Sequence, residues 1–141
     1  MEKQAKIKIV GTQKAEYEEP QRMEFITNGK LQRFGNKLCV SYEESDLFGM
    51  DGVTSTFEVQ EGRIALERTG KLRTRMEFVE GSRTESMYMM DVGTLLLGIT
   101  ARKVEENMTE NGGTIHLEYG VEIDRRLLGR STYDISVETL P

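Results

Sequence analysis

One arginine in this chain has the residue type and the position to bind a ligand. Arg68 has the same alternation parity as Ile64 and Leu66, so a strand that buries those two side chains turns Arg68 inward as well. An inward guanidinium could hold a carboxylate or a phosphate through two parallel hydrogen bonds. Alternatively, Arg68 reaches solvent from the strand end or pairs with a structural carboxylate, because charged groups are almost never buried alone.

Three tyrosines share parity with apolar neighbours and complete the candidate site. Tyr42, Tyr119 and Tyr133 each stand on the apolar side of an alternating segment. Their hydroxyls could orient the polar end of a ligand in a pocket. The alternative is that all three are core residues whose hydroxyls bond to the backbone. We predict Arg68, Tyr42, Tyr119 and Tyr133 as ligand-binding residues.

The residue types that commonly catalyse reactions are scarce. His116 is the one histidine and Cys39 the one cysteine, and both fall on the outward parity of their segments. A hairpin with its loop at residues 110–112 sets His116 opposite Glu106 as a surface pair. A triad needs a nucleophile and an orienting group beside the histidine, and zinc needs several ligands at short spacing. We predict no catalytic residue, no metal site and no cofactor.

The charged clusters are typical of a solvated surface. Acidic runs at residues 16–19 and 43–46 could serve glycoside hydrolysis or calcium binding, but their spacing matches no calcium loop, so solvent-exposed loops are expected. Basic residues crowd residues 63–75, where interspersed glutamates would pair with them across strands. Binding of a nucleic-acid strand calls for exposed aromatic side chains between the basic ones, which this segment lacks. A salt-bridged outer face is the better interpretation.

Composition sets the class of protein. The chain has 141 residues, of which 37% are hydrophobic and 30% charged, so we expect one soluble domain over residues 1–141. The net charge of −5 disfavours nucleic acid and anionic membranes as partners. We expect no secretory leader and no membrane-spanning segment, because no apolar run follows Met1 and none elsewhere is long enough, and one cysteine fits a reducing interior. A cytoplasmic location is expected.

The elements that must position these residues are short strands. Apolar and polar residues alternate in ten segments, near residues 7–9, 22–25, 38–43, 53–59, 64–66, 76–78, 86–89, 95–99, 115–123 and 133–137. Glycine-containing turns are predicted at residues 28–29, 35–36, 61–62, 69–70, 80–81 and 111–113. Longer loops are predicted at residues 14–21, 44–52 and 124–129.

One hairpin register can be predicted from charge and apolar pairing. A three-residue loop at residues 69–71 pairs Ile64 with Met76 and Leu66 with Thr74, and it sets opposite charges across the other face. A two-residue loop would mix apolar and charged residues on one face. We predict the three-residue loop.

These strands favour one closed architecture. Tight turns and one apolar face per strand predict an all-β fold, a single antiparallel up-and-down barrel of eight to ten strands. An open sheet of that size would leave two edges and an apolar face exposed. A β-sandwich is the alternative.

Several short motifs occur in a recognisable order. They are Ser41-Tyr42-Glu43-Glu44, Gly49-Met50-Asp51-Gly52, Arg68-Thr69-Gly70, Met76-Glu77-Phe78, Gly112-Gly113 and Tyr119. This ordered set resembles the YwiB-like family of small bacterial proteins over roughly residues 7–137. The resemblance implies a calycin-type barrel, similar in shape to lipocalins and fatty-acid-binding proteins, with no established activity. The chain departs from the expected Thr-Pro-Tyr-Gly-like turn, where it has Met90-Asp91-Val92-Gly93.

Three functions follow from a barrel with these faces. The leading prediction is a non-enzymatic protein that binds a small, mostly apolar ligand, with an anionic ligand as one option. The second is a homo-oligomeric interaction module with a filled core, because residues 95–97 are apolar on both faces of their strand. A hydrolase is the third. An internal cavity of about 300 Å³ or more would favour the binding protein.

Overall fold

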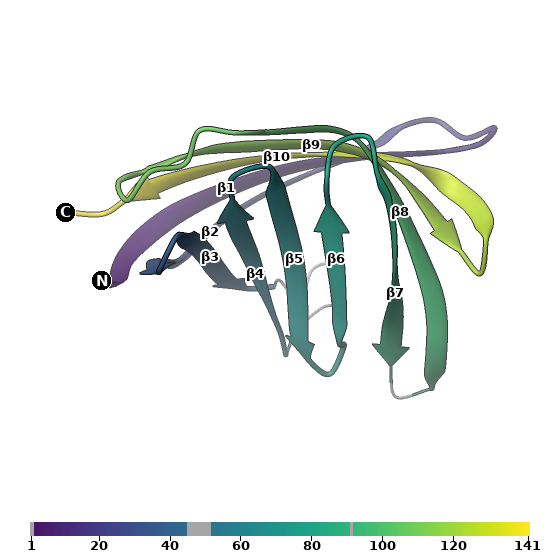
Figure 1. Cartoon of the computed structure of the whole chain (residues 1–141), viewed down its shortest axis with the longest axis horizontal. Helices are drawn as coiled ribbons and strands as arrows, with labels where there is room; N and C mark the ends of the chain where they lie inside the picture. The colour runs from purple at the N-terminus through teal and green to yellow at the C-terminus, as the bar shows by residue number, and fades with distance from the viewer. Residues whose placement is uncertain (1, 45–51, 91) are drawn as a thin grey trace.

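The alternating segments form ten antiparallel strands of one sheet (Figure 1). The computed structural model describes residues 2–44, 52–90 and 92–141. The strands are β1 (Glu2–Ala15), β2 (Gln21–Phe34), β3 (Lys37–Glu43), β4 (Val53–Gln60), β5 (Arg63–Gly70), β6 (Thr74–Phe78), β7 (Arg83–Met90), β8 (Gly93–Glu106), β9 (Gly112–Ile123) and β10 (Arg126–Thr139). No helix in the described part of the chain could span a membrane.

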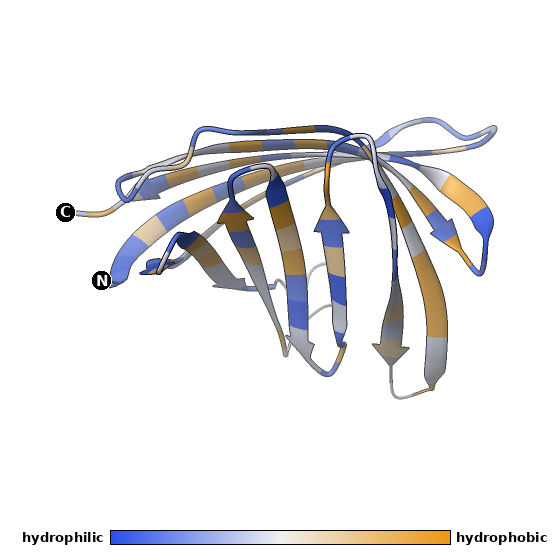
Figure 2. Ribbon diagram, viewed as in Figure 1, coloured by the Kyte–Doolittle hydropathy of each residue, from blue (hydrophilic) through white to orange (hydrophobic). Residues whose placement is uncertain are grey.

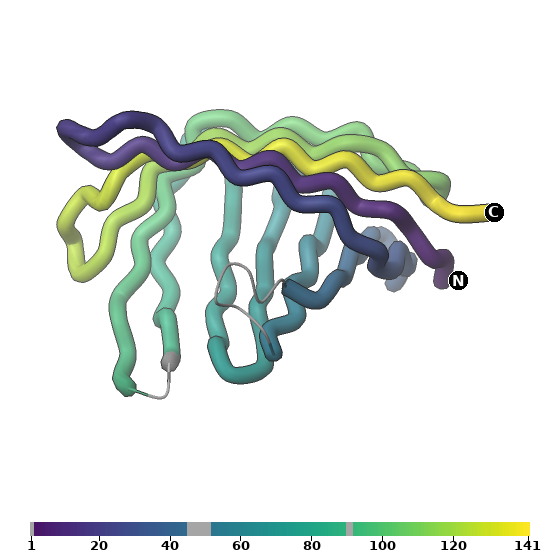
Figure 3. The backbone as a smooth tube through the Cα atoms, turned by 180° about the vertical axis from the view of Figure 1, so that it is seen from behind, coloured from purple at the N-terminus to yellow at the C-terminus, as the bar shows by residue number. Residues whose placement is uncertain are grey.

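The first and last strands pair with each other and join the two halves of the sheet. The strand order is β6-β5-β4-β3-β2-β1-β10-β9-β8-β7. Ile7 lies opposite Val137 and Ile9 opposite Ile135, so the two ends of the chain run side by side (Figure 3). The result is the predicted up-and-down barrel, nearly closed, rather than a sandwich.

The barrel has one weakly paired seam, between β6 and β7. Among the described residues, the backbone pairing recorded there is a single bridge, in which Arg73 and Met89 exchange N–H···O bonds of 3.0 and 2.9 Å. One side chain adds to it, because Thr84 Oγ1 donates to the Glu77 carbonyl at 2.9 Å. We call this boundary the β6–β7 seam.

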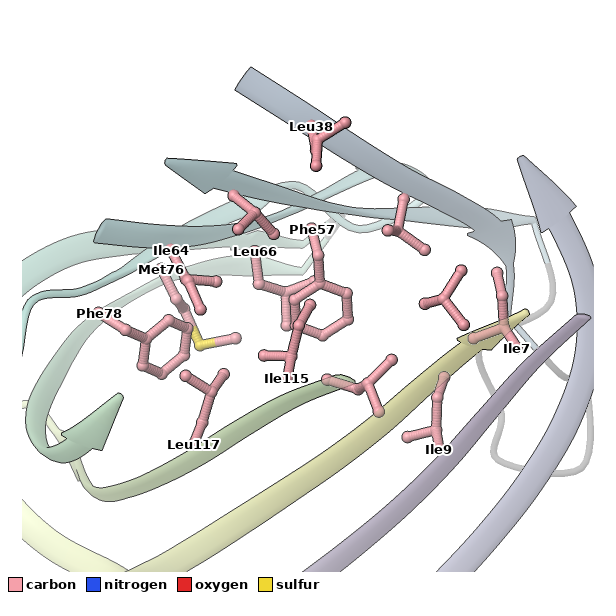
Figure 4. Packing of buried hydrophobic residues seen from close by; sticks show 14 of the residues in the cluster. Ile7, Ile9, Leu38, Phe57, Ile64, Leu66, Met76, Phe78, Ile115 and Leu117 are labelled. Carbon is pink, nitrogen blue, oxygen red and sulfur yellow. The ribbon is translucent and has the colours of Figure 1, made fainter. Parts of the chain in front are cut away.

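Apolar and polar residues alternate along the strands (Figure 2), and the apolar ones face the inside of the barrel. Along β4, for example, Val53, Ser55, Phe57 and Val59 are buried. Large side chains from opposite walls, among them Phe57, Phe78 and Leu117, meet in the interior (Figure 4). Each such side chain contributes roughly 1.5–3 kcal/mol through burial. This apolar core fills the end of the barrel that carries the chain termini and the β4–β5 turn.

The register predicted for the β5–β6 hairpin is wrong by two residues. Ile64 pairs with Phe78 and Leu66 with Met76, so the chain between the last paired residues covers 69–73 rather than 69–71. A shift of two residues keeps every side chain on its own face, so alternation cannot distinguish the two registers. The longer connection contains Leu72, which is buried at 7% exposure.

The turn predicted at residues 28–29 does not exist, because β2 runs through it. Gly29 pairs with Ala5 on one side and Tyr42 on the other. A Cβ at this position would lie 2.2 Å from the Ser41 carbonyl oxygen and 2.5 Å from Ile7 Cδ1. Gly29 therefore serves close packing between strands rather than a turn.

The loop predicted at residues 124–129 is a two-residue turn. Ile123 pairs directly with Arg126, and Asp124 and Arg125 adopt φ values of 50° and 69°. Turns of this shape usually carry Asn or Gly, so the sequence gives little signal for one here. A register shift between Leu127 and Gly129 follows at once.

Two motifs lie partly outside the described residues. These are the predicted loop at residues 44–52, of which Glu44 and Gly52 are described, and the turn that contains Asp91.

Candidate functional site

A layer of polar side chains crosses the inside of the barrel. Six of its members lie on the inward parity of their strands and Glu44 directly follows β3. We call them the polar layer: Tyr42, Glu44, Ser55, Arg68, Tyr119, Ser131 and Tyr133. Register places them together, because Tyr42, Ser55 and Arg68 are successive cross-strand partners on β3, β4 and β5. Tyr119 and Ser131 are partners on β9 and β10, across the barrel.

Arg68 is the centre of the polar layer. It is 8% exposed, so the prediction that it faces inward is confirmed and its escape to solvent is not. Its Nη2 donates to Tyr133 Oη at 3.1 Å, and its Nε donates to Ser55 Oγ at 3.4 Å. Burial by itself lowers the pKa of Arg68, but the neighbouring Tyr133 and Glu44 outweigh it and raise that pKa, so the guanidinium is a permanent cation.

Glu44 is the carboxylate that accompanies Arg68. We expected it in a solvated loop, and that expectation is wrong, because its side chain is only 6% exposed. Glu44 Oε2 lies 3.7 Å from Arg68 Nε and accepts a 2.5 Å hydrogen bond from Ser55 Oγ. Ser55 thus connects the two ions, and the ion pair is the reason that Arg68 can be buried.

Two tyrosines of the polar layer, Tyr42 and Tyr119, act as neutral hydroxyls. Burial, with Glu44 adding to it, raises the pKa of Tyr42 well above its usual value. Burial, with Tyr133 adding to it, also raises the pKa of Tyr119. Both hydroxyls therefore stay protonated at neutral pH, and they can donate or accept hydrogen bonds.

Aromatic contacts fix the layer against the apolar core beneath it. The ring centroids of Tyr119 and Phe78 are 4.9 Å apart and those of Tyr133 and Phe57 are 6.1 Å apart. Both pairs are edge to face. Tyr119 and Tyr133 stack on each other at 6.3 Å. Such pairs are worth roughly 0.5–1.5 kcal/mol each beyond burial, so the rings hold the hydroxyls in place.

A cavity of about 470 Å³ lies on the other side of the layer. Its inner lining includes Arg68, Tyr119, Ser131 and Tyr133. Its walls are mostly apolar and come from several strands, namely Met23, Met76, Tyr88, Leu95, Leu97, Val121, Ile123 and Leu128. Tyr42 does not line it, and it borders instead a space of about 30 Å³ with Glu44 and Tyr133. The barrel is therefore filled at one end and hollow at the other.

Two cations stand at the outer rim of this cavity. Lys14 and Arg130 are direct cross-strand partners on β1 and β10, both are exposed, and both contribute to the lining. Neither has an ion-pair partner within the described residues. Like charges directly opposite each other destabilise a sheet, so the stability of the fold does not explain why two cations are paired at this rim.

His116 lies on the outer face as predicted, but its predicted pairing with Glu106 is wrong. It lies opposite Glu105 rather than Glu106, because the turn at residues 110–111 is one residue shorter than the predicted loop, so that Glu106 pairs with Ile115. Its Nε2 contacts Glu118 at 2.7 Å and its Nδ1 contacts Asp134 at 2.5 Å, and hydrogen bonds to these two carboxylates raise the pKa of His116. All three side chains belong to the outer face and do not line the cavity.

Cys39 is on the outer face but is only 7% exposed. It lies between Gln32 and Glu58 on the neighbouring strands, whose side chains are also outside. Burial raises the pKa of its thiol and Glu58 adds to the effect, which disfavours the reactive thiolate.

Three residues of the polar layer were not predicted from the sequence, although a signal for each was present. Ser55 continues the inward parity of Val53 and Phe57, Glu44 continues that of Tyr42, and Ser131 continues that of Tyr133. Parity alone does not mark them as site residues, because polar side chains usually face solvent. Of the predicted set, the structure brings Arg68 and Tyr133 into contact, places Tyr119 beside them and sets Tyr42 behind Ser55.

Comparison with known proteins supports this architecture. A family model described as "Domain of unknown function (DUF1934)" matches residues 7–135. The uncharacterised β-barrel protein YwiB of Bacillus subtilis (strain 168) is 29% identical over 101 residues, which cover 72% of this chain and 70% of that protein. The crystal structure of the ywiB protein from Bacillus subtilis matches with a TM-score of 0.87 at 24% identity and covers 99% of this chain and 94% of that one. The predicted resemblance is confirmed, and the structural match shows the fold.

Proposed function

This chain belongs to the DUF1934 family, and from the interior of its barrel we propose that it is a non-enzymatic binding protein for a small, mostly apolar ligand. The observation that carries the proposal is the cavity of about 470 Å³. Ligand pockets of roughly 300–1,000 Å³ with apolar walls and a few fixed polar groups are typical of small-molecule sites. A fully packed core would leave no such space.

The polar groups are concentrated at the inner end of the cavity. Arg68, Tyr119 and Tyr133 line it there, so we assign them to the polar end of the ligand. Tyr42 belongs to the same layer, and we assign it a supporting role behind Ser55. The apolar remainder of the ligand would lie against Leu95 and the other wall residues.

Thermal unfolding with a panel of apolar compounds tests this proposal. A ligand at a hundredfold excess over its Kd stabilises the folded state by about 2.7 kcal/mol, which raises the Tm by several degrees. Leu95 lines the cavity, so Leu95→Trp should fill it and abolish the shift. Leu96 faces the other side of the same strand, so Leu96→Trp is the matched control and should retain it. A flat screen, or a shift that survives Leu95→Trp, contradicts the proposal.

A second candidate function rests on the outer face of β7 and β8. Met87 lies opposite Leu96, Met87 and Met89 are 46% and 48% exposed, and Leu96 is half-buried. This apolar surface suits the homo-oligomeric module, with a second copy of the chain as partner. Light scattering should then show a dimer that Met87→Glu disrupts, and a strict monomer at every concentration contradicts this alternative.

A further inference from the structure

We propose that the inner end of the ligand is an uncharged hydrogen-bond acceptor, such as an amide or ketone carbonyl, rather than a carboxylate. This inference rests on the proposed binding function and concerns the same cavity. It reverses the simplest interpretation of Arg68, which is that a buried cation attracts an anion. The reason lies in the charge that the polar layer already contains.

Arg68 has its anion within the protein. Glu44 Oε2 lies 3.7 Å from Arg68 Nε, and the Ser55 hydroxyl, 2.5 Å from the same oxygen, connects the two. The side chains of Arg68 and Glu44 are 10% and 6% exposed, so water screens the pair little. The pair is neutral as a whole.

A ligand carboxylate beside this pair would be a second anion for one guanidinium. Two carboxylates that share a buried site repel each other, and one of them is driven to take up a proton. The ligand would also lose its hydration without gaining a cation of its own. A neutral ligand avoids both costs.

The guanidinium still has donors for such a ligand. Nε donates to Ser55 and Nη2 to Tyr133, but within the described part of the chain Nη1 has no hydrogen-bond partner. Arg68 lines the cavity, and a guanidinium carries only donors, so its complement is an acceptor. A ligand oxygen that accepts from Nη1 would satisfy it without adding charge.

Lys14 and Arg130 provide the competing arrangement. They line the outer rim and could hold a carboxylate there, with the ligand tail pointing inward. That arrangement predicts tight carboxylate binding that depends on the rim and not on Glu44.

Decanamide and decanoate, compared by calorimetry at pH 8, separate the two arrangements. We expect the wild-type protein to bind decanamide at least about tenfold more tightly than decanoate, a difference of about 1.4 kcal/mol. Glu44→Gln removes the internal anion but keeps its shape, so decanoate should gain at least about tenfold. Glu43→Gln makes the same charge change on the neighbouring, exposed residue and should leave the order unchanged.

The outcomes are distinct. Tighter binding of decanoate to the wild type, or equal binding of the two probes, overturns the inference while the proposed function stands. The inference is also overturned if the protein prefers decanoate, the double variant Lys14→Gln with Arg130→Gln loses that preference, and Glu44→Gln keeps it. Binding of neither probe and of no other apolar compound overturns the proposed function itself. The wild-type order decides even if Glu44→Gln does not fold.

Discussion

At the scale of single residues, the interior and exterior arginines show how burial changes the role of an ion pair. Arg68 and Glu44 are both buried, whereas Arg75 bonds to Glu58 and Glu67 on the outer face and is 43% exposed. Exposed pairs are screened by water and contribute little. A buried pair contributes mainly through the cost of breaking it, because the remaining ion keeps no partner.

Replacing Arg68 should therefore destabilise the protein far more than replacing Arg75. Arg68→Met leaves Glu44 buried without a cation and should lower the free energy of unfolding by about 3–5 kcal/mol in urea denaturation. Arg75→Met is the control on the outer face and should cost clearly less than Arg68→Met, because water screens the ion that it leaves behind. The double change Arg68→Met with Glu44→Met should recover much of the loss. Equal losses in the two single variants would show that the buried pair has no special role.

Glu58 should give the protein a pH-dependent contribution to stability. Hydrogen bonds from Arg75 lower its pKa against the opposing effect of burial, and Lys37 adds to them, so that the pKa falls from 4.5 to about 2. A carboxylate whose pKa is lowered in the folded state stabilises the protein at pH values above its unfolded-state pKa. This stabilisation is lost as the pH falls toward the folded-state pKa. The difference in unfolding free energy between wild type and Glu58→Gln should therefore be constant above about pH 5. It should decrease as the pH is lowered from about 4.5 to 2. A difference independent of pH over this interval would argue against the assigned pair.

At the scale of elements, close approach between strands determines where glycine is needed. Gly29 lies in the middle of β2, against the Ser41 carbonyl of β3 and Ile7 of β1. Gly120 lies in the middle of β9, where an added Cβ would have its nearest neighbour, the Gly129 oxygen, at 3.9 Å. Neither position requires positive φ, so the two differ in space rather than in backbone conformation.

Gly29→Ala should consequently destabilise the protein, and Gly120→Ala should not. Overpacking of this kind costs about 1–3 kcal/mol, because backbone atoms cannot move aside as a flexible side chain can. Urea denaturation of both variants measures the difference. If both alanines are tolerated equally, the spacing between β2 and β3 is looser than the structure shows.

At the scale of the whole molecule, the barrel is closed firmly on one side and loosely on the other. β1 and β10 pair over almost their full length, whereas the β6–β7 seam has the bridge between Arg73 and Met89. Thr74 Oγ1 and Ser86 Oγ, one on each strand of the seam, are buried without a hydrogen-bond partner among the described residues. Unsatisfied buried hydroxyls are unfavourable, which adds to the weakness of the seam.

Hydrogen exchange should report this asymmetry. Amides of β7 that face the seam should exchange much faster than those in the β1–β10 ladder, because local opening there breaks few bonds. Exchange monitored by nuclear magnetic resonance gives the comparison residue by residue. Similar protection in β7 and β10 would mean that the seam is as stable as the rest of the barrel.

The sequence by itself determined the all-β class, the ten alternating segments and the inward direction of Arg68, because alternation with period two is a local property of the chain. It did not determine the β5–β6 register, since a shift of two residues preserves each face. Nor did it identify Gly29 as a packing residue, because the colliding atoms belong to β1 and β3.

Only the tertiary structure decided what the inward residues do. Glu44 and Arg68 are far apart in sequence and meet across strands. The division of the barrel into a packed end and a hollow end depends on how side chains from all ten strands pack together. Side-chain parity says which way a residue points, whereas partners and empty volume depend on distances between strands that local pattern does not encode.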